Sequence, residues 1–209
     1  VYKALYSNAA NFTTYIVGNV DLATLKPLVE KYLGSLPVSK KLIKKADDGV
    51  RAVKGVVVND FKVKMQQPKV GVTRVFTGDI DYTIKNRVAM NVLSQVLRSR
   101  YTISIREEKG GTYSVGVGGR VMAEYEPWYQ LIVLFDTNEQ MADELSQIVI
   151  DEIKKIATDG PNAEDVEKTR KYLLKEYENQ IQQNGTWIDW LDLYHYRGMN
   201  SLAEYKKAI

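Results

Sequence analysis

Ile-Arg-Glu-Glu-Lys-Gly-Gly-Thr-Tyr-Ser-Val-Gly, residues 105–116, marks the change from helix to strand around which the fold of this chain can be worked out. The pattern predicts that Arg106 lies at a helix end, that Gly110 and Gly111 break the chain, and that Tyr113 opens an alternating strand. This order can direct one guanidinium and one phenol toward the same point. Both groups are hydrogen-bond donors suited to a peptide carbonyl or a developing oxyanion. Arg106 and Tyr113 are therefore the candidate site residues.

Downstream of this stretch, the periodicity of apolar residues predicts two strands followed by three helices. The expected strands are 112–122 and 128–135, and the expected helices are about 138–158, 162–183 and 186–197. Asn162 is well placed to cap the second of these helices. Residues 201–209 resemble the start of a further helix.

Upstream, apolar residues from Ile84 to Leu97 mark one face of a long helix. We expect a break in it near 99–102 and a shorter helical piece from Ile103 to the double glycine. Farther upstream, the sequence predicts the tail of a helix at 1–6, a strand at 12–20, a helix that begins after Asp21 and stops at Gly34, a lysine-rich connector over 38–54, and strands at 56–61 and 70–76.

The order of these elements predicts the fold class. Strands and helices do not alternate regularly, as they would in a doubly wound sheet. We expect a single α+β domain over residues 1–209, with a mostly antiparallel β-sheet and helices packed on one face.

Composition excludes several classes of protein. The chain is 44% hydrophobic and 26% charged, which is ordinary for a globular protein. Its formal net charge of +3 is too weak to indicate a nucleic-acid or membrane-surface partner. It contains no cysteine, which excludes disulfides and thiolate sites and suits a periplasm as well as a reducing cytosol.

The single histidine bears on metal chemistry. Zinc peptidases of the His-Glu-x-x-His or His-x-x-Glu-His type need two histidines one helical turn apart. This chain has only His195, so it cannot hold such a zinc site by itself. A small hydrolase that uses His195 is one alternative, although a histidine among tyrosines at a helix end is more often structural. From composition alone, Arg106 would pair with a local carboxylate and Tyr113 would be an ordinary strand aromatic.

A family resemblance changes that interpretation. Residues 105–116 resemble the C-terminal half of the M16 (pitrilysin/insulinase-type) zinc metallopeptidases, in which an arginine and a tyrosine are also seven positions apart. Val-Gly-Asn-Val-Asp at 17–21 and the helix at 25–37 resemble the entry to a domain of that family. The segment 176–187 is similar to the late helices of its longer, bacterial PqqL-like members. The departure is Gly111, which stands where many members have a bulkier residue and which affects how rigidly the turn holds the pair.

The resemblance implies a fold, and it implies that the two halves of the parent enzyme contribute different residues to the active site. It implies the M16, LuxS-like α+β domain, as one part of a longer chain whose two halves close around an unfolded peptide. The zinc motif would lie in the N-terminal half, which this chain lacks. Tyr113 would donate to the oxyanion of the tetrahedral intermediate, and Arg106 would bind a substrate carbonyl or fix Tyr113. The chain alone would hold no metal and cleave no peptide.

Three further expectations follow from this resemblance. The partners would be the N-terminal half and a peptide substrate, and an open sheet edge would allow a homodimer. Bacterial relatives imply the periplasm.

The alternative is a non-catalytic M16-like scaffold or peptide-binding domain, which would have no need of both Arg106 and Tyr113.

Overall fold

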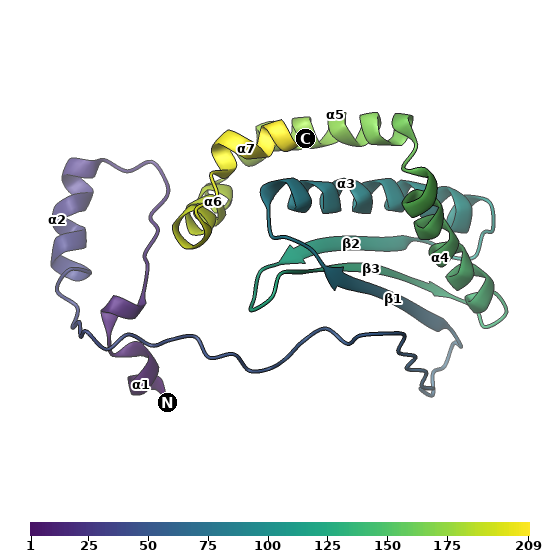
Figure 1. Cartoon of the computed structure of the whole chain (residues 1–209), viewed down its shortest axis with the longest axis horizontal. Helices are drawn as coiled ribbons and strands as arrows, with labels where there is room; N and C mark the ends of the chain where they lie inside the picture. Colours follow the sequence, from purple (N-terminus) through teal and green to yellow (C-terminus); the bar gives the residue numbers. More distant parts are fainter. The chain divides into compact units, whose positions relative to one another are not determined.

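The computed structural model describes all residues from 1 to 209 (Figure 1). The chain forms two compact units. The first unit comprises residues 1–50 and 178–201, and the second comprises residues 51–177 and 202–209. The prediction of a single domain over 1–209 stays a prediction, and each unit is described by itself.

The helices and strands follow the predicted order over most of the chain. They are α1 (Tyr2–Tyr6), the 3-10 helix η1 (Ala9–Asn11), α2 (Leu22–Tyr32), β1 (Val70–Asp79), α3 (Ile84–Tyr101), the π-helix η2 (Thr102–Glu107), β2 (Val115–Met122), β3 (Trp128–Thr137), α4 (Ala142–Asp159), α5 (Ala163–Gln180), α6 (Asn184–Arg197) and α7 (Ser201–Ala208).

The second unit is built on a three-stranded antiparallel sheet with the order β1-β3-β2. Phe135 of β3 stands opposite Val72 of β1 and Val115 of β2, which fixes the register of both pairs. Side chains alternate between the two faces of a strand. In β3 this places Leu131, Val133 and Phe135 on the buried face.

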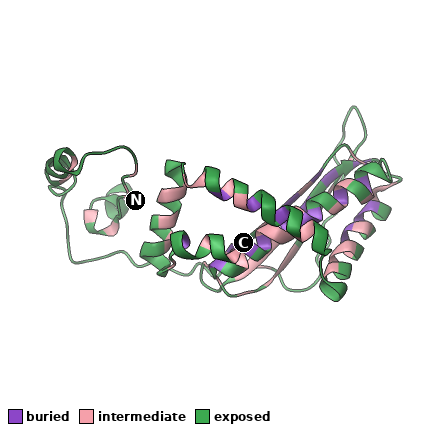
Figure 2. Ribbon diagram, turned by 90° about the horizontal axis from the view of Figure 1, so that it is seen from above, coloured by how far each residue is buried: buried purple, intermediate pink, exposed green.

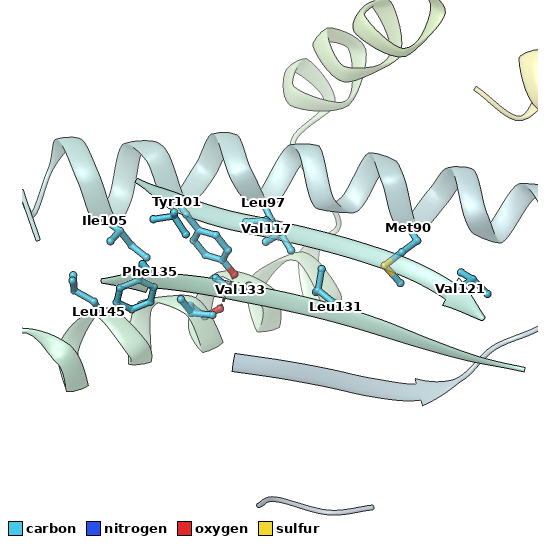
Figure 3. Close-up of a cluster of buried hydrophobic side chains, with 12 residues drawn as sticks. Met90, Leu97, Tyr101, Ile105, Val117, Val121, Leu131, Val133, Phe135 and Leu145 are labelled. Atoms are coloured by element: carbon cyan, nitrogen blue, oxygen red, sulfur yellow. Dashed lines mark hydrogen bonds between the residues drawn. The ribbon is translucent and has the colours of Figure 1, made fainter. Parts of the chain in front are cut away.

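The core lies between this face and two helices. The helix α3 runs along the sheet, and α4 lies beside the same face (Figure 1). Figure 3 shows Leu97 and Tyr101 of α3 directed toward Val117, Val133 and their neighbours. The Tyr101 hydroxyl donates to the Val149 carbonyl of α4 at 2.9 Å, so the one polar atom of this buried side chain is satisfied.

The opposite face of the sheet carries more exposed residues. Val75 of β1 is 49% exposed and Leu134 of β3 is 51% exposed, whereas Leu131, Val133 and Phe135 are buried. Figure 2 shows that the buried residues of this unit gather on the strands and the helices packed on them. Helices therefore cover one face of an antiparallel sheet, and the predicted α+β class is confirmed.

Two of the predicted strands are wrong. Residues 12–20 and 56–61 form no strand, although both contain alternating or β-branched residues. A strand exists only through hydrogen bonds to a neighbouring strand, and neither segment has one beside it. Val56, for example, is 94% exposed.

The predicted helix N-caps are present in the structure. The Asp21 carboxylate accepts from the backbone N–H of Thr24 at 2.8 Å, and the Asn162 side chain accepts from Glu164 N–H at 2.8 Å. Both predicted N-caps are thus present. The hydrogen bonds from the Thr24 side chain and backbone lower the pKa of Asp21.

Candidate functional site

The structure brings the two predicted site residues together. The guanidinium carbon of Arg106 lies 5.6 Å from the centroid of the Tyr113 ring, a cation–π geometry. Both side chains are exposed, and Tyr113 is 87% exposed. Arg106 forms its side-chain contact with this ring and not with a carboxylate, so the pair presents two hydrogen-bond donors at one place on the surface.

A π-helix presents Arg106. The helix α3 does not break at 99–102 as predicted but widens into η2, in which the backbone N–H of Glu108 donates to the Ile103 carbonyl at 2.9 Å. Within η2, Ile105 is fully buried and Arg106, the next residue, is exposed. Ile105 thus anchors the segment in the core while Arg106 remains at the surface. Short π-helical segments are rare and frequently occur at functional sites.

The turn that follows depends on both glycines. Gly110 has a φ of +61°, in the left-handed region that favours glycine. Gly111 is buried and is held at both of its backbone groups: its N–H donates to the Ile105 carbonyl at 3.2 Å, and its carbonyl accepts from the Thr137 hydroxyl at 2.6 Å. The turn that connects Arg106 to Tyr113 is therefore fixed at its second glycine.

Packing around Gly111 explains why no larger residue stands there. A Cβ atom at this position would lie 2.5 Å from Cδ1 of Leu145 and 2.9 Å from Cε of Met141. Leu145 is fully buried at the start of α4. Close packing of α4 on the turn thus leaves little room for a side chain at residue 111.

An ion pair also joins the turn to α4. Lys109 pairs with Glu144, and the hydrogen bond to this carboxylate, together with its charge, raises the pKa of Lys109. Both side chains are about half exposed, so the pair contributes little to stability. Glu144 and Thr137 were not predicted as site residues, because each meets the turn only through the tertiary fold.

His195 lies in the first unit, within a different group of side chains. Its Nε2 is 3.4 Å from the Thr13 hydroxyl, which also accepts from the Tyr196 hydroxyl at 3.1 Å. The ring of Tyr15 meets that of His195 edge-on, and burial together with the nearby Asp192 charge raises the pKa of Tyr15. These contacts connect the segment around Thr13 to α6, as a structural role of His195 would require.

The chain has no cluster that could hold a metal ion. No group of three or more histidine, cysteine, aspartate or glutamate side chains converges on one point. Nor is any helix both long enough and apolar enough to cross a membrane.

A hollow of about 250 Å³ lies in the second unit between α3, α4 and the start of α5. Its central cation is Arg100, which donates to Glu152 at 3.2 Å and lies 4.0 Å from Asp165. The hydrogen bond to Glu152 raises the pKa of Arg100. Arg100 thus links α3 to α4 and α5 through these two carboxylates. Neither Arg106 nor Tyr113 lines this hollow.

Comparison with known proteins places the chain in a family. The family model described as Peptidase M16 inactive domain matches residues 1–173. An Arabidopsis thaliana protein named "Zinc protease PQQL-like" is 22% identical over 205 residues, which cover 90% of this chain and 21% of that protein. The crystal structure of the periplasmic protease PqqL from Escherichia coli superimposes with a TM-score of 0.74 at 19% identity, over 92% of this chain and 21% of that one.

The same fold also occurs within a shorter structure. The first half of the Escherichia coli PqqL protease matches with a TM-score of 0.63 at 14% identity, over 92% of this chain and 43% of that chain. The fold alone therefore does not assign the chain to one half of such a protein. The chain spans about a fifth of the length of the PqqL-like relatives it matches. It belongs to the M16 peptidase family, in the part described as the inactive domain, and resembles the PqqL-like zinc proteases.

Proposed function

We propose that this chain is a C-terminal-half domain of an M16-type zinc metalloendopeptidase. In this proposal it binds no zinc itself and supplies Arg106 and Tyr113 to an active site whose His-x-x-Glu-His motif lies in the N-terminal half. Tyr113 donates to the oxyanion of the tetrahedral intermediate. Arg106 binds a substrate carbonyl or fixes the phenol.

The geometry of the Arg106–Tyr113 pair is the observation that carries this proposal. Tyr113 is 87% exposed, and its hydroxyl forms no hydrogen bond within the chain. Exposure alone does not single out Tyr113, because Tyr2 and Tyr32 are also exposed. What distinguishes Tyr113 is the guanidinium of Arg106 over its ring and the turn before it, which is held at the buried Gly111. A free donor held in this way suits an oxyanion.

The pair also supports the assignment to the C-terminal half. The arginine and tyrosine seven positions apart are the feature of that half which this sequence resembles, whereas the fold also occurs in the first half of the Escherichia coli PqqL protease. Zinc would then belong to the parent enzyme, in agreement with the zinc proteases among the relatives. This chain has one histidine and no carboxylate–histidine cluster with which to bind it.

The proposed partners are the N-terminal half of the parent and an unfolded peptide. The compartment that we propose is the bacterial periplasm, by analogy with the Escherichia coli PqqL protease. The edge strand β1 has a neighbour on one side only, so a homodimer through this edge is a further proposal. A sedimentation coefficient that corresponds to the monomer at every concentration would contradict it.

A catalytically inactive M16-like scaffold is the second candidate. The family description itself, an inactive domain, fits a part that carries no metal motif. The flanking sequence of the parent separates the two candidates. A His-x-x-Glu-His motif upstream favours the peptidase, and its absence favours the scaffold.

Steady-state kinetics of the full-length parent test the proposed function. Tyr113→Phe removes only the hydroxyl and should lower kcat about 100-fold, with KM changed by less than about twofold. Tyr125→Phe is a matched control, because Tyr125 also lies against an arginine, Arg51, at 5.1 Å from its ring. The control should keep its kcat, and an unchanged kcat in Tyr113→Phe would make Tyr113 merely structural. The separate 209-residue chain should carry no stoichiometric zinc and show no chelator-sensitive proteolysis.

A further inference from the structure

The turn between Arg106 and Tyr113 is held by a residue far away in the sequence. Thr137 is the last residue of β3 and is 8% exposed. Its hydroxyl donates to the Gly111 carbonyl at 2.6 Å. No other side chain donates a hydrogen bond to the backbone of the turn from Glu108 to Thr112.

This hydrogen bond lies where it can affect the positions of both Arg106 and Tyr113. Gly111 is two residues before Tyr113, and its N–H is bonded to Ile105, the residue before Arg106. The peptide groups of Gly111 thus connect the two site residues through the backbone. The preceding residue, Gly110, has a φ of +61° and permits alternative turn conformations, because glycine has few steric restrictions. The hydrogen bond from Thr137 to the Gly111 carbonyl favours one of these turn conformations.

We propose that Thr137 is a positioning residue for the Tyr113 phenol and its arginine. Its hydroxyl fixes the Gly111 carbonyl and thereby the path of the chain into β2. This path determines where the Tyr113 ring lies and therefore where Arg106 can contact it. This inference rests on the proposed function for its effect on catalysis. Its effect on the geometry of the pair is independent of that function.

The test of geometry uses the 209-residue chain and nuclear Overhauser effects between the Tyr113 ring and the Arg106 side chain. Thr137→Val retains the shape of the residue but removes the donor, and Thr137→Ser retains the donor. We expect the ring–guanidinium contacts to weaken at least about threefold in Thr137→Val and to persist in Thr137→Ser. Thr73→Val, at an exposed position of β1, is the matched control and should leave them unchanged. Unchanged contacts in Thr137→Val would overturn the proposal. If that variant does not fold, Thr137→Cys, a weak donor of similar size, replaces it.

The test of catalysis uses a double-mutant cycle in the full-length parent. Thr137→Val should lower kcat about tenfold with KM nearly constant, and Thr137→Ser should restore it. In the Tyr113→Phe background, Thr137→Val should have no further effect, because the hydroxyl that it positions is already absent. An equal loss in both backgrounds would show a general structural role and overturn the proposal. Failure of the proposed function gives a different result, in which Tyr113→Phe keeps its kcat while the nuclear Overhauser effects still respond to Thr137.

Discussion

The guanidinium of Arg106 lies over the ring of Tyr113, with 5.6 Å between the guanidinium carbon and the ring centroid. Contact with the ring face leaves the phenol hydroxyl available at the ring edge. The cation is held beside the phenol without a carboxylate partner that would neutralise it. We propose that the two donors act on the same carbonyl or oxyanion.

Gly111→Ala tests how closely the turn packs on α4. The new methyl group would lie 2.5 Å from Cδ1 of Leu145, so this fully buried side chain would have to shift within the core. We expect the free energy of unfolding of the second unit to fall by about 1–3 kcal/mol, measured by denaturant titration. Gly118→Ala is the control, because a Cβ atom there meets nothing within 4 Å. Equal stability of the two variants would contradict the packing described here.

Glu152→Gln tests the ion pair that links α3 to α4. The side chain of Glu152 is 17% exposed and accepts from Arg100 at 3.2 Å. Since Arg100 is partly open to solvent, screening limits the loss to about 1 kcal/mol of unfolding free energy. The exposed pair of Lys168 and Glu164 provides a control, for which Glu164→Gln should cost about 0.3 kcal/mol or less. Thermal melting that ranks the two variants in the opposite order would argue against this account.

Asp21 should make α2 sensitive to acid. Its folded-state pKa is lowered by hydrogen bonds from Thr24, so the stabilisation is present above the ordinary carboxyl pKa and is lost as the pH falls through the lowered value. We expect the Thr24 amide to lose protection from hydrogen exchange only as the pH falls below the ordinary carboxyl pKa, after correction for the intrinsic exchange rate. In Asp21→Asn the side chain still caps the helix but does not titrate, so the same amide should respond less. Identical pH profiles in the two proteins would contradict the assignment of this effect to Asp21.

The helices could be predicted from the sequence because their signals are local. Asp21 and Asn162 cap helices within three residues of themselves, and both caps are present. Strands at 12–20 and 56–61 were predicted wrongly because β-propensity describes a segment that fits a sheet, not the presence of a neighbour. The strand at 70–79 has the same kind of sequence and does have a partner, β3.

Of the candidate site, the sequence predicted only the two side chains, Arg106 and Tyr113, and not the backbone that holds them. The spacing of Arg106 and Tyr113 indicated that they could meet, and the structure brings them together. The π-helical form of η2 arises from a hydrogen bond five residues back and had no recognisable sequence signature. Thr137 lies 26 residues from Gly111, so its contact depends on the docking of β3 beside the turn.

Inhibition by a phosphinic peptide tests the role of Tyr113 most directly, because its tetrahedral centre resembles the oxyanion intermediate. The inhibition constant should be compared in the full-length parent and its Tyr113→Phe variant, beside the dissociation constant of an uncleaved peptide of the same sequence. If Tyr113 donates to the oxyanion, the variant should bind the phosphinic peptide about 100-fold more weakly and the uncleaved peptide within about twofold of the parent. Equal losses for both ligands, or no loss for the phosphinic peptide, would contradict the proposed role of Tyr113.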